Sequence, residues 1–120
     1  MQQLALAVDG LEEALSSPPT FQQPWRHIVR ERLGEVCEAL TAERTAVADS
    51  WLSARAGHLQ RERNRLLVRL SVLGAMVAEA SDVEAVRISL LRLVPDLHHH
   101  QQRVNDLVYD AVGMDVGGSE

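Results

Sequence analysis

A single apolar stripe near the C-terminus constrains the fold of this chain more than any other feature of its sequence. The stripe follows alternating steps of three and four residues without an error, through Val83, Val86, Leu90, Leu93, Leu97, His100, Val104, Leu107 and Ala111. This spacing is typical of a long helix that buries one face along its length. Pro95 lies off the stripe and is expected to kink the helix, because it frees the carbonyl of Leu91. Gly113 is expected to end the helix.

Three earlier segments show related spacing and predict three more helices. The first extends from about Gln2 to Leu15, and the prolines of residues 16–20 end it. The second begins near Pro24, a residue that suits the first turn of a helix, and we expect the reversal after it between residues 49 and 57. The third ends near Ala80.

The boundary before the last helix has a recognisable signal. Ser81-Asp82-Val83-Glu84 matches the S-x-x-E capping box, in which the Ser and Glu side chains satisfy each other's free backbone donors. The sequence therefore predicts that Ser81 caps the fourth helix.

These segments together predict the fold class. Aromatic residues make up only 3% of the chain, which is unfavourable for a β-sandwich or barrel, and no strand pattern competes with the helical one. Short connections favour antiparallel neighbours. We therefore expect an all-α, antiparallel up-and-down four-helix bundle with a short first helix, formed by residues 1–112 as one domain. One end of this bundle should contain three helices, and residues 113–120 should form a flexible C-terminal tail.

Charge and cysteine content exclude several classes of function. The chain has 17 acidic and 12 basic residues, a net charge of −5, and every basic residue is Arg. This balance argues against a nucleic-acid partner or an anionic membrane surface. The lone Cys37 excludes an internal disulfide, and no signal peptide or membrane span is recognisable. We expect a cytoplasmic protein, and the absence of Lys is typical of GC-rich bacterial genomes.

Three stripe positions are polar, one in each long helix: Glu43, Arg63 and His100. Arg63 lies 18 residues before Ser81 and His100 lies 19 after it, so both should sit about 27–28 Å from that turn. Glu43 joins this depth if the preceding reversal is near Ser53. We expect a buried polar cluster in which Arg63 donates to Glu43 and His100. The alternatives are an Arg63 that extends its head to solvent, or an error in register.

Two segments resemble the hemerythrin-like, HHE cation-binding family. Residues 97–109, LHHHQQRVNDLVY, resemble the last helix of that family, and residues 59–67, LQRERNRLL, resemble the helix that carries a ligand His after a Glu. The resemblance implies a four-helix bundle with a di-iron site. Arg63 and Glu43 stand where the family commonly has His, and Asn105 stands where it has a carboxylate. The resemblance therefore implies a degenerate bacterial member without a metal site.

Two functions remain open from this resemblance. The first is a non-catalytic interaction or regulatory module without a cofactor, whose protein partner is unknown and could be a second copy of the chain. The second is a metal-binding (di-iron) or oxygen-responsive protein. Its iron ligands would come from His100, Asp106, Glu43, Glu62 and His58.

The remaining histidines and a row of arginines give weaker indications of function. His98 and His99 cannot share one ion with His100, because adjacent helical residues point about 100° apart. His58 or His99 could serve a phosphotransfer domain, but such sites usually place Lys and Gly after the His. A further set of residues recurs at every fourth position and forms either a solvated face or a docking face for an acidic partner: Arg61, Arg65 and Arg69.

Nucleophile chemistry has no support in the sequence. It contains no nucleophile elbow and no Gly-rich phosphate loop. Cys37 stands among acidic neighbours, which disfavour a thiolate. We therefore expect that the chain is not an enzyme.

Overall fold

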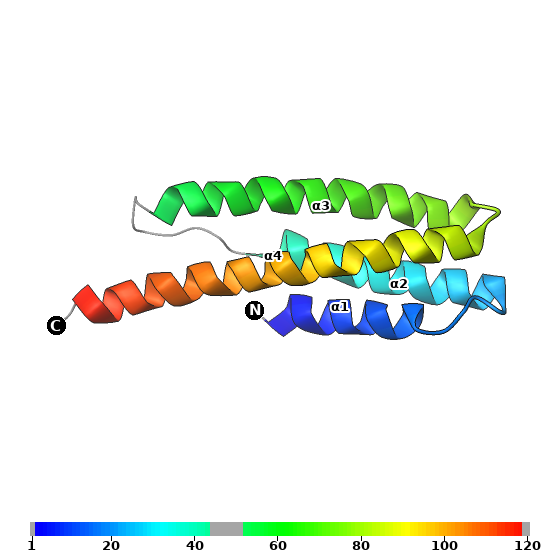
Figure 1. Ribbon diagram of the computed structural model, residues 1–120, viewed down its shortest axis with the longest axis horizontal. Coiled ribbons are helices and arrows are strands. Elements are labelled where there is room, and N and C mark those ends of the chain that lie inside the picture. Colours follow the sequence, from blue (N-terminus) through cyan, green and yellow to red (C-terminus); the bar gives the residue numbers. More distant parts are fainter. Residues whose placement is uncertain (1, 44–51, 119–120) are drawn as a thin grey trace.

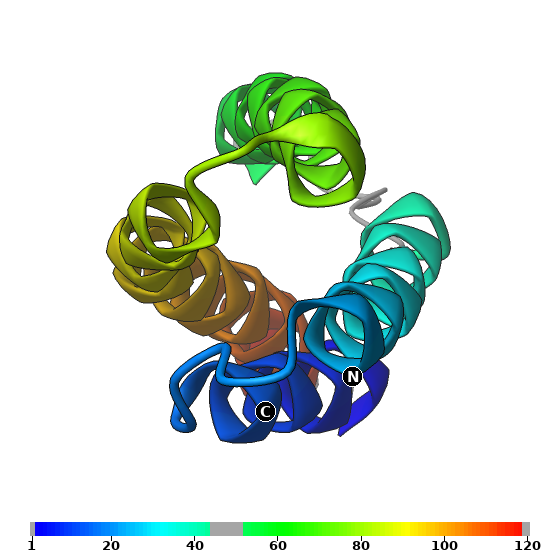
Figure 2. The same ribbon diagram turned by 90° about the vertical axis from the view of Figure 1, so that its right-hand side faces the viewer.

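The computed structural model describes residues 2–43 and 52–118, and in these ranges the chain forms four helices and no strand. The helices are α1 (Gln2–Leu15), α2 (Gln22–Thr41), α3 (Ser53–Glu79) and α4 (Val83–Gly118). They surround a common axis (Figure 2), and the molecule measures 59 × 21 × 19 Å. The α1–α2 and α3–α4 connections lie at the same end of the molecule (Figure 1). The all-helical class predicted from the periodicity is confirmed.

The stripe of α4 is buried as its spacing predicts. From Val83 to Leu107 every stripe residue is buried, and Ala111 is half-buried. The helix includes Pro95. It also continues through Gly113 to Gly118, so the predicted end at Gly113 was wrong. No glycine in the described ranges has a positive φ, and a helical glycine costs only about 1 kcal/mol relative to Ala.

The end of α2 and the capping residue of α4 differ from the prediction. α2 ends at Thr41, before the predicted reversal window of 49–57, and the Thr41 hydroxyl donates to the Cys37 carbonyl over 2.8 Å. Residues 44–51, including the predicted stripe residue Val47, lie outside the described ranges. The N-terminal cap of α4 is Asp82 rather than Ser81, because Asp82 Oδ1 accepts the Ala85 N–H over 3.1 Å. The shift by one residue leaves the boundary itself where it was predicted.

Arginine side chains satisfy carbonyls at two helix ends. Arg26 of α2 donates to the carbonyls of Val77 and Ala80 at the end of α3, over 2.7 and 2.6 Å. Arg87 of α4 donates through Nε to the Leu15 carbonyl at the end of α1, over 2.8 Å. The last carbonyls of a helix have no partner within it, so these arginines both bond the helix ends and join neighbouring helices.

The buried apolar side chains form two clusters. The larger one includes residues from all four helices. The smaller one consists of Leu52, Ala56 and Leu59 on one side and Val104 and Leu107 of α4 on the other. In the described ranges this end of the core is built from α3, α4 and Leu52, rather than from the three helices that we predicted. α4 extends well beyond the start of α1 (Figure 1).

In the described ranges, no helix is both long enough and apolar enough to cross a bilayer.

Candidate functional site

A buried histidine lies between the two apolar clusters. His100 is fully buried on the stripe of α4, three residues after Leu97 and four before Val104. Its Nδ1 lies 2.6 Å from Oε1 of Glu62 on α3. Its Nε2 lies 2.8 Å from Oε2 of Glu43, two residues beyond the end of α2. One imidazole thus connects three segments of the bundle.

On its solvent side, Glu62 is bonded by Arg103, which lies one turn after His100 on α4. Arg103 donates through Nε to Glu62 Oε1 over 3.2 Å and through Nη2 to Glu62 Oε2 over 2.7 Å. This bidentate pair is of the stronger, charge-assisted kind. We call Glu43, His100, Glu62 and Arg103 the charged layer; its four formal charges cancel when His100 is protonated.

The geometry determines the protonation state of His100. An ionised carboxylate only accepts hydrogen bonds, so both ring nitrogens must carry a proton to satisfy Glu43 and Glu62. Burial alone would lower the pKa of His100, but the hydrogen bonds and charges of the two carboxylates outweigh it and raise the pKa above its ordinary value of 6.5. Geometry and charge therefore both favour the imidazolium over the neutral ring at this site.

Glu62 shows the complementary effect. Its partial burial acts to raise its pKa, but the hydrogen bonds from Arg103 and then His100, together with their charges, outweigh burial. The pKa of Glu62 lies below its ordinary value of 4.5 as a result. The carboxylate is thus stabilised in its charged form by the two cations that it contacts.

Arg63 occupies a different place from the one predicted. Its guanidinium donates to the main-chain carbonyl of Glu43 over 3.2 Å, and the carboxylates that bond His100 come from Glu43 and Glu62. The side chain is half-buried. The expected bridge from Arg63 to Glu43 and His100 was wrong, because Glu62 is the α3 residue that faces His100.

The remaining residues of the predicted metal set lie elsewhere. Asp106 is exposed on α4 and accepts a hydrogen bond from Gln102 over 3.0 Å. His58 is exposed on α3, and both residues line a separate cavity beside Arg103. The structure thus brings together only three of the five proposed ligands, namely His100, Glu43 and Glu62.

These three residues do not fit a di-iron centre. The donor set has one imidazole, and its two carboxylates bond opposite ring nitrogens, so they do not converge on one point. Across the described ranges, no group of three or more His, Cys, Asp or Glu side chains is arranged to hold a metal ion. An imidazolium also has no lone pair to offer a metal.

The other predicted surface residues are exposed. Arg61, Arg65 and Arg69 lie on the outer side of α3, where Arg69 pairs with Asp96 over 2.7 Å. His98 pairs with Glu12, and His99 is exposed as well. Burial raises the pKa of the Cys37 thiol, which disfavours its nucleophilic form.

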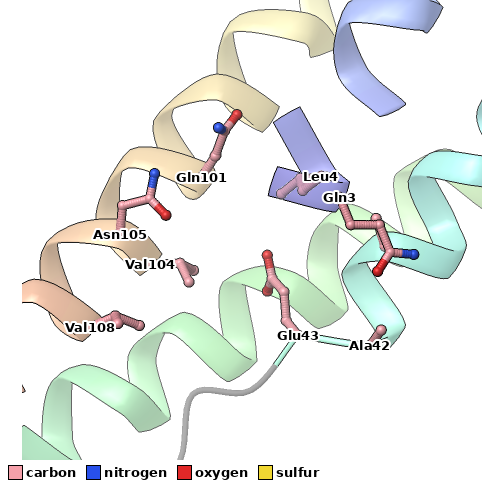
Figure 3. A pocket seen from close by; sticks show the side chains of 9 residues that line it. Gln3, Leu4, Ala42, Glu43, Gln101, Val104, Asn105 and Val108 are labelled. Atoms are coloured by element: carbon pink, nitrogen blue, oxygen red, sulfur yellow. The ribbon is translucent and has the colours of Figure 1, made fainter. Parts of the chain in front are cut away.

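A pocket of about 380 Å³ opens beside the charged layer. Its polar walls come from Glu43, Gln3, Gln101 and Asn105, and its apolar walls include Leu4, Val104 and Val108. Figure 3 shows the Glu43 carboxylate pointing into the space between α4 and the start of α1. Oε1 of this carboxylate is buried and has no hydrogen-bond partner among the described residues.

Sequence reasoning named Glu62 only as a metal ligand and missed Arg103. The signal was available in the distance from Ser81, because Glu62 lies 19 residues before it and His100 lies 19 residues after it. Equal separation from a tight turn places two residues at equal depth on paired helices. Arg103 then follows as the cation one turn from His100 on the same helix.

Comparison with known proteins found no relative: no protein-family model, no curated protein and no solved structure matches the chain.

Proposed function

We propose that the chain is a non-catalytic interaction or regulatory module, built as an antiparallel up-and-down four-helix bundle on a degenerate hemerythrin-like scaffold. The observation that carries this proposal is the double engagement of His100 by Glu43 and Glu62, at 2.8 and 2.6 Å. In this reading the charged layer stands where a metal site would otherwise be, and its role is to hold α3, α4 and the end of α2 in one register. A single arrangement of buried partners can specify register in this way.

An exposed face of α3 supports a role in binding. Val68, Val72 and Met76 are 64%, 55% and 41% exposed and recur at every fourth residue. Arg61 and Arg65 continue the same side of the helix toward its N-terminus. Apolar surface bordered by charge is typical of protein contact sites.

Metal analysis tests the proposal. The full chain is purified without a metal-affinity resin, and its iron, zinc, manganese and copper are measured per chain. The proposal predicts contents far below one metal per chain, and the same result for His100→Leu. Iron near one or two atoms per chain that disappears in His100→Leu would overturn the proposal.

Binding through α3 has its own test. Sedimentation velocity is measured over a wide concentration range for the chain, for Val72→Asp and for Arg92→Asp, an exposed residue on α4. Self-association that Val72→Asp removes and Arg92→Asp retains would assign the face to a homodimer. A strict monomer at all concentrations would contradict the homodimer.

A hemerythrin-like metal or oxygen-responsive protein is the second candidate function. One observation favours it: an imidazole and two carboxylates gather at one depth of the bundle. Iron could enter only if His100 lost its second proton, so this candidate predicts iron uptake that increases steeply with pH. Anaerobic titration with Fe(II) at several pH values, compared with His100→Leu, distinguishes the two candidates.

A further inference from the structure

We infer that the pocket beside Glu43 is a binding site for a small organic ammonium ion with a compact aliphatic body. The pocket shares Glu43 with the charged layer, but the inference concerns Oε1, the carboxylate oxygen that His100 does not bond. It rests on one unsatisfied charged atom and on the chemistry of the walls around it.

The unsatisfied atom is Oε1 of Glu43. The Glu43 side chain is only 9% exposed, and Oε2 of the same carboxylate is bonded to His100. Oε1 is buried without a partner among the described residues, and the carboxylate that carries it points toward the pocket (Figure 3). A buried acceptor without a donor is costly, so a bound donor at this position would remove that cost.

The charge of the pocket selects the kind of donor. Among the described residues, Glu43 is the only charged one that lines it. Arg63 bonds the Glu43 main-chain carbonyl and does not line the pocket. Hydrogen bonds between an ammonium and a carboxylate are charge-assisted and roughly twice as strong as neutral ones. His100 bonds Oε2 of the same carboxylate, so Oε1 is the acceptor left for such a donor.

The remaining walls fit the rest of such a ligand. An ammonium has three N–H donors. Glu43 Oε1 can accept one, and the walls hold three further side-chain carbonyls as acceptors, those of Gln3, Gln101 and Asn105. Leu4, Val104 and Val108 offer apolar surface to an alkyl group. The volume of about 380 Å³ is at the low end of small-molecule sites, which range from roughly 300 to 1,000 Å³, and this limits the ligand to a compact one.

The test uses three probes with the same branched carbon skeleton: 3-methylbutylammonium, 3-methylbutan-1-ol and 3-methylbutanoate. Each is titrated into the ¹⁵N-labelled full chain in phosphate buffer at pH 7, and amide shifts are followed. We expect the ammonium to shift the signals of Glu43, Gln101 and Val108 saturably. The alcohol should bind roughly tenfold more weakly, the factor that a difference of about 1.4 kcal/mol represents, and the carboxylate should not bind.

Three variants test whether binding depends on the pocket itself or only on an intact fold. Glu43→Gln keeps the shape but removes the negative charge, and should abolish the preference for ammonium over alcohol. Val108→Phe fills the pocket without changing a member of the charged layer, and should abolish binding while the His100 ring signals stay unchanged. Glu38→Gln, an exposed carboxylate on α2, is the matched control and should bind like the parent chain.

The contrary results are equally specific. Equal affinity for ammonium and alcohol, or ammonium binding that survives Val108→Phe, would overturn the inference. Shifts that never saturate would mean that the pocket holds water alone, and would overturn it too. Should Glu43→Gln fail to fold, Val108→Phe and the comparison of the three probes decide the question alone.

Discussion

His100 on α4 and Glu62 on α3 meet at 2.6 Å between two separate apolar clusters of the core. The contact places a charged hydrogen bond at the point where the four-helix part of the bundle gives way to the α3–α4 pair. Because Glu43 bonds the other ring nitrogen at 2.8 Å, the imidazolium lies between two carboxylates, and the stability of this region depends on its charge.

Removing the imidazole should destabilise the protein strongly. His100→Leu leaves Glu43 buried without a cation on Oε2, and we expect it to lower the free energy of unfolding by about 3 kcal/mol at pH 7. Urea denaturation followed by circular dichroism measures this change. His98→Leu is the matched control, because His98 and Glu12 are each 43% exposed, and exposed pairs are worth about 1 kcal/mol or less. Equal losses in the two variants would contradict the account.

The stabilisation by the charged layer should decline at both high and low pH. The pKa of His100 is raised, so its contribution is complete below 6.5, the ordinary value, and is lost as the pH rises through the pKa of the folded state. The pKa of Glu62 is lowered, so its contribution is complete above 4.5 and is lost as the pH falls through its folded value. The difference in unfolding free energy between the parent chain and His100→Leu should therefore be largest between about pH 4.5 and 6.5 and decline on either side. A difference that is constant from pH 4 to 9 would contradict it.

Replacing Arg63 or Arg103 should lower the free energy of unfolding less than replacing His100. Arg63→Leu removes one hydrogen bond to a main-chain carbonyl and should cost about 1 kcal/mol. Arg103→Leu removes a bidentate pair with Glu62, but the Arg103 side chain is 47% exposed, so solvent screening keeps its cost to about 1 kcal/mol as well. Arg92→Leu, on the exposed side of α4, serves as the control, and thermal unfolding compares the three. A loss in Arg63→Leu as large as that in His100→Leu would show that Arg63 belongs to the layer.

A glycine inside α2 offers a stabilising change. A Cβ built on Gly34 meets no other atom within 4 Å, and the residue is helical and exposed. Gly34→Ala should therefore raise the free energy of unfolding by about 1 kcal/mol, the usual difference in helix propensity. No gain in the denaturation midpoint would contradict the helical assignment at this position.

The sequence allowed the helices to be predicted more fully than their ends. The stripe of α4 was regular enough that all its positions from Val83 to Leu107 are buried, and it left out only Val94, which is buried as well. The end of α2 was not predictable in the same way, because apolar spacing continues to Val47 although the helix ends at Thr41. Periodicity records which face is buried, whereas a helix end depends on local hydrogen bonds such as that from Thr41 to Cys37.

The candidate site shows the same limit. The stripe identified His100 and Glu43 as inward-facing and selected Arg63 on α3, but its neighbour Glu62 makes the contact. Residues 62 and 63 point about 100° apart, and both are half-buried. Which of them faces α4 depends on the rotation of α3 about its axis, which the packing of neighbouring helices sets and periodicity alone does not.

The protonation state of His100 tests the central claim most directly. In ¹⁵N-labelled, metal-free protein, the two ring nitrogens of an imidazolium resonate close together, whereas those of a neutral ring are widely separated. The His100→Leu variant assigns the signal. We predict that most His100 rings carry a proton on both nitrogens at pH 6.5, the ordinary pKa, and lose the second proton only at higher pH. A neutral His100 ring at or below pH 6.5 would contradict the charged layer.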